Sequence, residues 1–282
     1  MSTALQGQYA LGVALVITAA VTYSTAGLFT KGVVAGAWAV IFWRGLFAAA
    51  FTTAWTLGRG TFRSNFFGIG RSGRAVAIIG ALGTAAFIPA FKLTSIANVA
   101  LIYAVAPLLA AALAWRFIGE RMTTRTWLGC IGALAGVAVI VTGSVGQASL
   151  LGDALALWMT VAMATIMVIY RKYPQTPGAG PSALQSILLL LVAAVLGQPF
   201  AVAPVEIAIL AAFGLLFAIA SVTLAEGSKR VPSVQAALLG ALETPLAPIL
   251  AFLVLAEVPA MATVLGGAIV LGAVLLSIRQ AP

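Results

Sequence analysis

Residues 95–120 read SIANVALIYAVAPLLAAALAWRFIGE, and residues 233–257 read SVQAALLGALETPLAPILAFLVLAE. Each stretch begins with Ser, carries Pro twelve residues later and ends with Glu, and the distance from Pro to Glu differs by one residue. Three glycines follow within the next 16 residues in both cases. Two Ala- and Leu-rich helices can also align by composition alone. We favour an internal repeat, because the order and the spacing of these residues agree.

The composition places the chain in a lipid bilayer. Of the 282 residues, 62% are apolar and only 7% are charged. A soluble domain has about 45–50% apolar and about 25% charged residues. One membrane-spanning helix needs about 20 apolar residues, so the chain has room for roughly ten such helices and little else.

We predict an all-α membrane protein with ten transmembrane helices. Apolar runs of the required length alternate with short connections that are rich in Gly, Pro or charged residues. The predicted spans cover residues 9–29, 37–57, 74–93, 96–117, 125–143, 151–170, 183–199, 205–227, 232–255 and 260–278.

The basic residues indicate which way the spans face. If the helices alternate in direction, Lys31 and Lys92 lie on one side and Arg44 lies inside the second span. Most Lys and Arg residues lie on the opposite side of the membrane. By the positive-inside rule that side is cytoplasmic, and it also holds both termini. We therefore expect a multi-pass protein of the cytoplasmic (inner) membrane. A nucleic-acid partner is not expected, because the loops are too short to form a basic surface. The basic residues on the predicted cytoplasmic side are Arg59, Arg63, Arg71, Arg74, Arg116, Arg121, Arg125, Arg171, Lys172, Lys229, Arg230 and Arg279.

The repeat also predicts the architecture. Its second copy lies five spans after the first, and an odd shift makes the two copies enter the membrane from opposite sides. The sequence therefore predicts two inverted five-helix repeats, residues 1–147 and 148–282. In this arrangement Pro107 is equivalent to Pro245, and Glu120 to Glu257. Inverted repeats recur in secondary transporters, whose two halves expose one central site alternately to either side.

Several kinds of site are excluded by the residues themselves. The chain has no His and a single Cys, Cys130, so it has no His triad, no His or Cys metal cluster and no internal disulfide. A P-loop motif is absent as well. We expect no metal, no cofactor and no catalytic residue. A membrane-embedded enzyme is the less favoured alternative, since no pair of carboxylates has a suitable spacing.

The chain resembles the EamA-type branch of the drug/metabolite transporter superfamily, whose ten helices form two five-helix repeats. The resemblance rests on Lys31 at the end of the first span, Arg44 in the second, the repeated Pro, Glu and Gly pattern, and Gly152-Asp153 at the start of the second repeat. Tyr23-Ser24 stands where that family often has Trp-Gly. The aromatic content and the compact loops are similar to those of its amino-acid exporters.

Glu243 is the first candidate site residue, because it lies near the middle of the ninth predicted span. A carboxylate at that depth is costly unless it faces a wet cavity or the bundle interior. We interpret Glu243 as a site that carries a proton or binds an amine. The alternative is a neutral Glu bonded to a backbone carbonyl that Pro245 or Pro248 has freed.

Arg44 is the second candidate, about 10 Å inside the outer end of its span. Its guanidinium could bind the carboxylate of an amino acid through two parallel hydrogen bonds. Two structural roles stay open beside that one. Arg44 could extend to the membrane surface, or it could pair with Glu243 and hold the bundle together.

Four aromatic residues complete the predicted substrate site: Tyr23, Trp43, Tyr103 and Trp158. All four fall in the outer halves of their spans, several residues inside the helix ends. They could line a pocket for a flat, partly polar ligand, or anchor the helices at the membrane interface.

The prolines and glycines suggest hinges and close helix contacts. Pro107 and Pro245 are hinge candidates, with static kinks as the alternative. Gly132-x-x-x-Gly136 allows two helices to pack closely. We favour packing within the chain, and hence a monomer, over a dimer contact.

The sequence thus predicts a secondary transporter that exports a small-molecule substrate, with amino acids, and aromatic ones among them, as the leading candidates. Export of other amphipathic drugs or metabolites is the alternative, and a passive channel is a further one.

Overall fold

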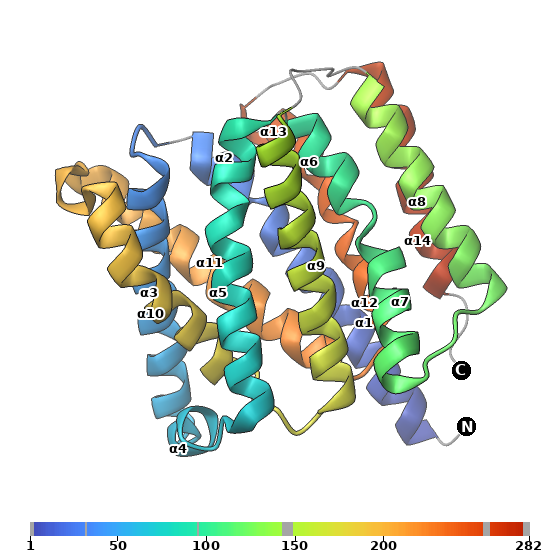
Figure 1. The fold of residues 1–282 in the computed structure, drawn as a ribbon, viewed down its shortest axis with the longest axis horizontal. Helices are drawn as coiled ribbons and strands as arrows, with labels where there is room; N and C mark the ends of the chain where they lie inside the picture. The colour runs from blue at the N-terminus through green and yellow to red at the C-terminus, as the bar shows by residue number, and fades with distance from the viewer. Residues whose placement is uncertain (1–2, 32, 95, 143–148, 256–259, 279–282) are drawn as a thin grey trace.

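The chain folds as a bundle of helices (Figure 1). A computed structural model describes residues 3–31, 33–94, 96–142, 149–255 and 260–278. All regular secondary structure in these ranges is helical. In chain order the helices are α1 (Thr3–Ser24), α2 (Ala26–Lys31), α3 (Ala37–Gly58), α4 (Phe62–Phe66), α5 (Gly70–Leu93), α6 (Ile96–Tyr103), α7 (Ala106–Ile118), α8 (Thr124–Thr142), α9 (Leu150–Lys172), α10 (Ala179–Gly197), η1 (Pro199–Ala201), α11 (Pro204–Ser228), α12 (Ser233–Gly240), α13 (Glu243–Leu255) and α14 (Met261–Ile278).

Every predicted span coincides with one helix or with two consecutive helices, with ends that differ by a few residues. Within the described ranges, eight segments are long and apolar enough to cross a membrane, by length and composition. Met261–Ser277 is apolar but shorter. The remaining predicted span is α5, 24 residues long, which packs against α9 and α10. The short helices α4 and η1 lie in connections and were not predicted.

Two of the predicted spans are broken in the same way. Helix α6 has 8 residues and α7 has 13, and helices α12 and α13 have 8 and 13. Two residues separate the helices of each pair, Ala104–Val105 in the first and Ala241–Leu242 in the second. Each second helix carries its Pro in the first turn, at Pro107 or Pro245, where the missing N–H costs no helical hydrogen bond.

A third break, at Thr25, separates α1 from α2 and was not predicted. Three hydroxyl groups at and before this break donate to backbone carbonyls. Thr22 Oγ1 donates to Thr18 O at 2.7 Å, Ser24 Oγ to Val21 O at 2.6 Å, and Thr25 Oγ1 to Thr22 O at 2.7 Å. Such bonds to the preceding turn compete with the backbone ladder and bend helices.

The two similarly broken spans run in opposite directions. In Figure 1, α6 lies high and α7 low, whereas α12 lies low and α13 high. Helix packing follows the same relation, because α1 packs on α11 as α9 packs on α5, and α3 packs on α11 as α10 packs on α5. Both findings support inverted repeats. The equivalence of Glu120 and Glu257 stays a prediction, since Glu257 lies outside the described residues.

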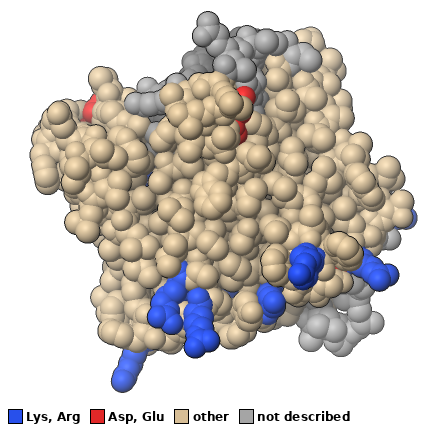
Figure 2. Space-filling view, viewed as in Figure 1, with Lys and Arg blue, Asp and Glu red and all other residues tan. Residues whose placement is uncertain are grey.

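Charge divides the molecule into two ends. Figure 2 shows Lys and Arg gathered toward the lower end of the visible face and Asp and Glu near the upper end. Helix α1 begins and α14 ends at this lower end (Figure 1). The charge asymmetry predicted from the loops is therefore present in the folded chain.

Helices α8 and α14 form a closely packed pair at one side of the bundle. A Cβ added at Gly136 would lie 2.7 Å from the carbonyl oxygen of Gly266 and 2.8 Å from a methyl carbon of Val270. Gly132 also lies against α14, at Ala273. The Gly-x-x-x-Gly sequence is therefore used within the chain, as predicted.

Gly136→Ala should lower the stability of the protein by about 1–2 kcal/mol, because the new methyl group forces two backbones apart. Gly272→Ala is the matched control, since a Cβ there meets nothing within 4 Å. Thermal unfolding of both variants in detergent tests this. Equal thermal unfolding midpoints for the two variants would show that the close contact between α8 and α14 does not contribute to stability.

Candidate functional site

Residues at or near the three helix breaks share one buried apolar cluster. Ala104 and Leu242, one from each two-residue break, belong to the same buried apolar cluster. Tyr23, two residues before the break at Thr25, packs against this cluster. Tyr103 is the last residue of α6, and Glu243 is the first residue of α13. Three predicted site residues therefore sit at or next to three separate breaks.

Electrostatic interactions link four of the six predicted site residues. The Tyr23 hydroxyl interacts with the charges of both Glu243 and Arg44. Tyr103 interacts with Glu243 and with Tyr23. These side chains come from α1, α3, α6 and α13, so the fold brings together groups that lie up to 220 residues apart in the sequence. The structure places them as one group of two phenols, one carboxylate and one guanidinium.

Glu243 occupies a favourable position for a carboxylate. The N-terminus of a helix carries a partial positive charge, and Glu243 begins the 13-residue helix α13. Its side chain is partly exposed. Within the described ranges it forms no ion pair with Arg44 and no hydrogen bond with a carbonyl freed by Pro245 or Pro248. Neither of the two structural alternatives for Glu243 is therefore seen.

Arg44 lies on α3 and is 6% exposed. Its guanidinium carbon lies 4.2 Å from the ring centre of Phe217 and 5.4 Å from that of Phe213. The Nε atom is buried and has no hydrogen-bond partner. A charged side chain in a membrane interior costs about 2.5–3.5 kcal/mol on insertion scales. The aromatic rings offset part of this cost through cation–π contacts. Arg44 does not extend to the surface.

A small cavity adjoins Arg44, with room for about one water molecule. Three polar side chains that the sequence analysis missed share its wall: Thr84 of α5, and Gln185 and Ser186 of α10. Gln185 lies between Ser182 and Ser186 at membrane depth, and that polar run is the signal that could have identified it. Phe217 connects this cavity with Tyr23. It lines the cavity, and its ring lies edge-on to Tyr23 with centres 5.9 Å apart.

Two predicted aromatic residues do not join this group. Trp158 is 48% exposed on the outer face of α9, beside Leu157, which is 47% exposed. Trp43 donates from Nε1 to the carbonyl oxygen of Pro199 at 2.8 Å and stacks on Phe47. Trp43 therefore fastens α3 to the connection after α10. The placement of both residues favours the anchoring role over the pocket role.

Glu120 ties three segments together at the basic end. Its Oε1 accepts from Arg171 Nε at 2.9 Å, and its Oε2 accepts from the backbone N–H of Ser233 at 3.1 Å. Arg171 also donates to the carbonyl oxygen of Lys229 at 3.3 Å. One carboxylate thus holds α9 and the first residue of α12 to the end of α7.

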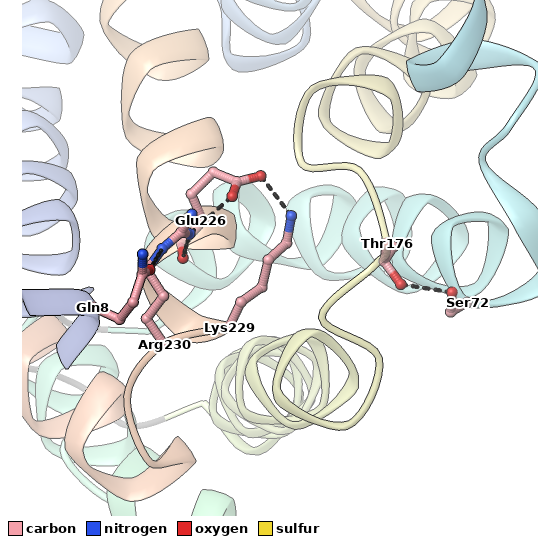
Figure 3. Close-up of polar contacts among 6 residues, drawn as sticks. All are labelled: Gln8, Ser72, Thr176, Glu226, Lys229 and Arg230. Carbon is pink, nitrogen blue, oxygen red and sulfur yellow. Dashed lines mark hydrogen bonds and ion pairs between the residues drawn. The ribbon is translucent and has the colours of Figure 1, made fainter. Parts of the chain in front are cut away.

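A second polar cluster lies at the same end (Figure 3). Glu226 forms ion pairs with Lys229 and Arg230, and Arg230 Nε donates to Gln8 Oε1 at 3.1 Å. The cluster joins α11 to α1. Nearby in the same view, Ser72 and Thr176 are hydrogen-bonded at 2.7 Å and join α5 to the connection before α10.

Comparison with known proteins decides the class. Residues 10–142, from α1 to the end of α8, match the model of the EamA-like transporter family. This segment is similar to the EamA-like transporter family. The resemblance seen in the sequence is confirmed. The chain thus carries an EamA-like segment that covers the first five predicted spans, and the family indicates a membrane transporter of small molecules.

A solved structure has the same fold as this chain. One crystal structure of a protein superposes with a TM-score of 0.79 over 94% of this chain and 96% of the other. The two sequences are 22% identical, so the likeness shows the fold alone. A search of curated proteins finds no match.

Proposed function

We propose that this protein is a secondary transporter that exports small metabolites, foremost amino acids, aromatic ones included, across the cytoplasmic membrane. Two inverted five-helix units, residues 1–147 and 148–282, would work by alternating access. The observation that carries the proposal is the grouping of Tyr23, Tyr103 and Glu243, each of which lies at or next to a helix break. In secondary transporters, substrate sites lie near the bilayer midplane where helices are discontinuous.

The charges at the site favour a zwitterionic substrate. Glu243 offers a negative charge for an ammonium group, and Arg44 offers a positive charge for a carboxylate. Both act on the Tyr23 hydroxyl. Neither forms an ion pair with a described residue, which leaves both available to a ligand. Two phenol rings next to these charges suit an amphipathic side chain.

Transport into proteoliposomes tests the proposal. The purified protein is reconstituted and offered radiolabelled amino acids, amines and related metabolites at two pH values. We expect saturable uptake of at least one amino acid, with a rate that depends on the proton gradient. Absence of flux for all of these solutes under any ion gradient would contradict the proposal. Uptake that does not saturate would indicate a channel instead.

We propose further that both termini are cytoplasmic, because the basic residues gather at that end. The prediction is tested with single cysteines in a Cys130→Ala background. Val34→Cys and Phe200→Cys, at positions 96% and 83% exposed, should react with an impermeant maleimide in intact cells. Phe67→Cys, at a position 79% exposed, should react only after lysis. Reaction of Phe67→Cys in intact cells would overturn the topology.

A further inference from the structure

The cavity beside Arg44 contains a buried cation that forms no ion pair with any described residue. Arg44 is 6% exposed, its Nε has no partner, and it lines the cavity together with Thr84, Gln185 and Ser186. None of the residues that line this cavity is Asp or Glu. A buried charge is normally paired or hydrogen-bonded, because an unpaired one loses its hydration without compensation. The cavity therefore lacks the group that its chemistry requires.

We propose that this cavity is an anion subsite that receives the carboxylate group of the transported solute. The inference rests on the proposed transport function and extends it, because it requires that the solute carries a carboxylate. The guanidinium Nε–H, the Thr84 hydroxyl and the Gln185 amide are hydrogen-bond donors around the cavity. Ser186 Oγ already donates to Ser182 O, so it is not counted among these donors. Charge-assisted hydrogen bonds from a guanidinium to a carboxylate are among the strongest in proteins.

The size of the cavity fits one end of a solute rather than a whole molecule. It has room for about one water molecule, which is the space that a carboxylate oxygen needs. Ile41 and Leu189 provide apolar walls on α3 and α10. The rest of the solute must then lie outside the cavity.

Phe217 determines where the rest of the solute lies. Its ring packs on the Arg44 guanidinium and also contacts Tyr23, whereas Tyr23 does not line the cavity. The Phe217 ring therefore lies between the cavity and Tyr23, and the proposal requires this side chain to rotate when the solute binds. A solute with its carboxylate on Arg44 would place its ammonium group toward Glu243.

Formate and formamide distinguish an anion subsite from a simple polar void, because they have nearly the same shape and differ in charge. We expect formate to raise the thermal midpoint of the purified protein in a saturable way and formamide to have no such effect. Arg44→Gln should abolish the formate effect. Arg63→Gln, which changes an exposed Arg on α4, should retain it. Gln185→Leu, which leaves Arg44 in place, should weaken the formate effect. It is the substitute test if Arg44→Gln fails to fold.

The same measurement separates a solute carboxylate from a free inorganic anion. Chloride and formate are tested in parallel, with sodium isethionate holding the ionic strength constant. Stabilisation by chloride alone would show a halide site and overturn the proposal. An equal response to formate in wild type and in Arg44→Gln would overturn it as well.

Stability in the absence of ligand gives an independent test. Arg44→Met removes the unbalanced charge and keeps an unbranched apolar side chain, so we expect a higher thermal midpoint than in wild type. A lower midpoint would mean that Arg44 serves to hold the aromatic rings of α11 in place, and the subsite would be refuted.

Transport distinguishes failure of the subsite from failure of the proposed function. For a transported amino acid, its methyl ester should compete for uptake about tenfold more weakly or worse in wild type. Arg44→Gln should remove this preference. Efficient transport of amines that lack a carboxylate would refute the subsite while export of metabolites stands. No transport of any solute would refute the proposed function, and the formate measurement would still decide whether the cavity binds anions.

Discussion

Replacing Glu243 with Gln should leave the protein folded and inserted but remove the pH-dependent part of transport. The amide keeps the size of the side chain and cannot exchange a proton. We expect uptake driven by a proton gradient to fall about tenfold or more. Glu243 interacts electrostatically with Tyr23 and Tyr103, and Tyr23 interacts with Arg44 as well. Uptake is measured in proteoliposomes over a range of pH.

Three control variants sharpen this result. Glu206→Gln makes the same change at an acid outside the site, whose Oε1 accepts from the backbone N–H of Val34. It should transport as wild type does. Tyr23→Phe and Tyr103→Phe remove the neighbouring hydroxyls and should keep the pH dependence if the proton resides on Glu243. An unchanged rate and an unchanged pH profile in Glu243→Gln would make Glu243 a structural residue.

Glu120→Ala should destabilise the basic end of the bundle by about 3 kcal/mol. It removes a helix cap, worth about 1 kcal/mol, at Ser233. It also removes a charge-assisted hydrogen bond from Arg171, for which about 1.5–3 kcal/mol is usual. Thermal unfolding of the purified protein measures the loss.

A double-mutant cycle separates the two contributions. Arg171→Ala alone and together with Glu120→Ala gives the coupling between the two side chains, and Arg121→Ala, at an exposed neighbour of Glu120, is the control. A coupling free energy of zero would show that the ion pair contributes nothing. The loss in Glu120→Ala would then come from the cap alone.

The helices were predictable because hydropathy marks them directly. Long apolar runs end at charged or Gly- and Pro-rich connections, and each predicted span has its helix. Pro107 and Pro245 also marked two of the helix breaks, since Pro cannot continue the backbone ladder. The third break, at Thr25, depends on weak hydroxyl bonds and leaves little trace in the sequence.

The inward faces of the helices were harder to predict. In a soluble helix a polar face marks the outside, but lipid is as apolar as the core, so a membrane helix gives no such contrast. On α9 the exposed Trp158 and the buried Ala156 lie two residues apart and are both apolar. Buried polar residues were the reliable signal, because only they are costly in lipid. Arg44 and Glu243 were identified for this reason, whereas no such signal was present to choose between the pocket role and the anchoring role of Trp158.

The unbalanced charge of Arg44 also exposes the protein to the membrane voltage. A conformational change that moves Arg44 along the membrane normal moves charge through the transmembrane field. One elementary charge carried across a full 100 mV corresponds to about 2.3 kcal/mol. An ionised Glu243 would offset that charge, and a zwitterionic solute adds no net charge to it. The field would then act on the empty and the loaded carrier alike, whereas protonation of Glu243 would leave the charge of Arg44 unbalanced and make the conformational change sensitive to voltage.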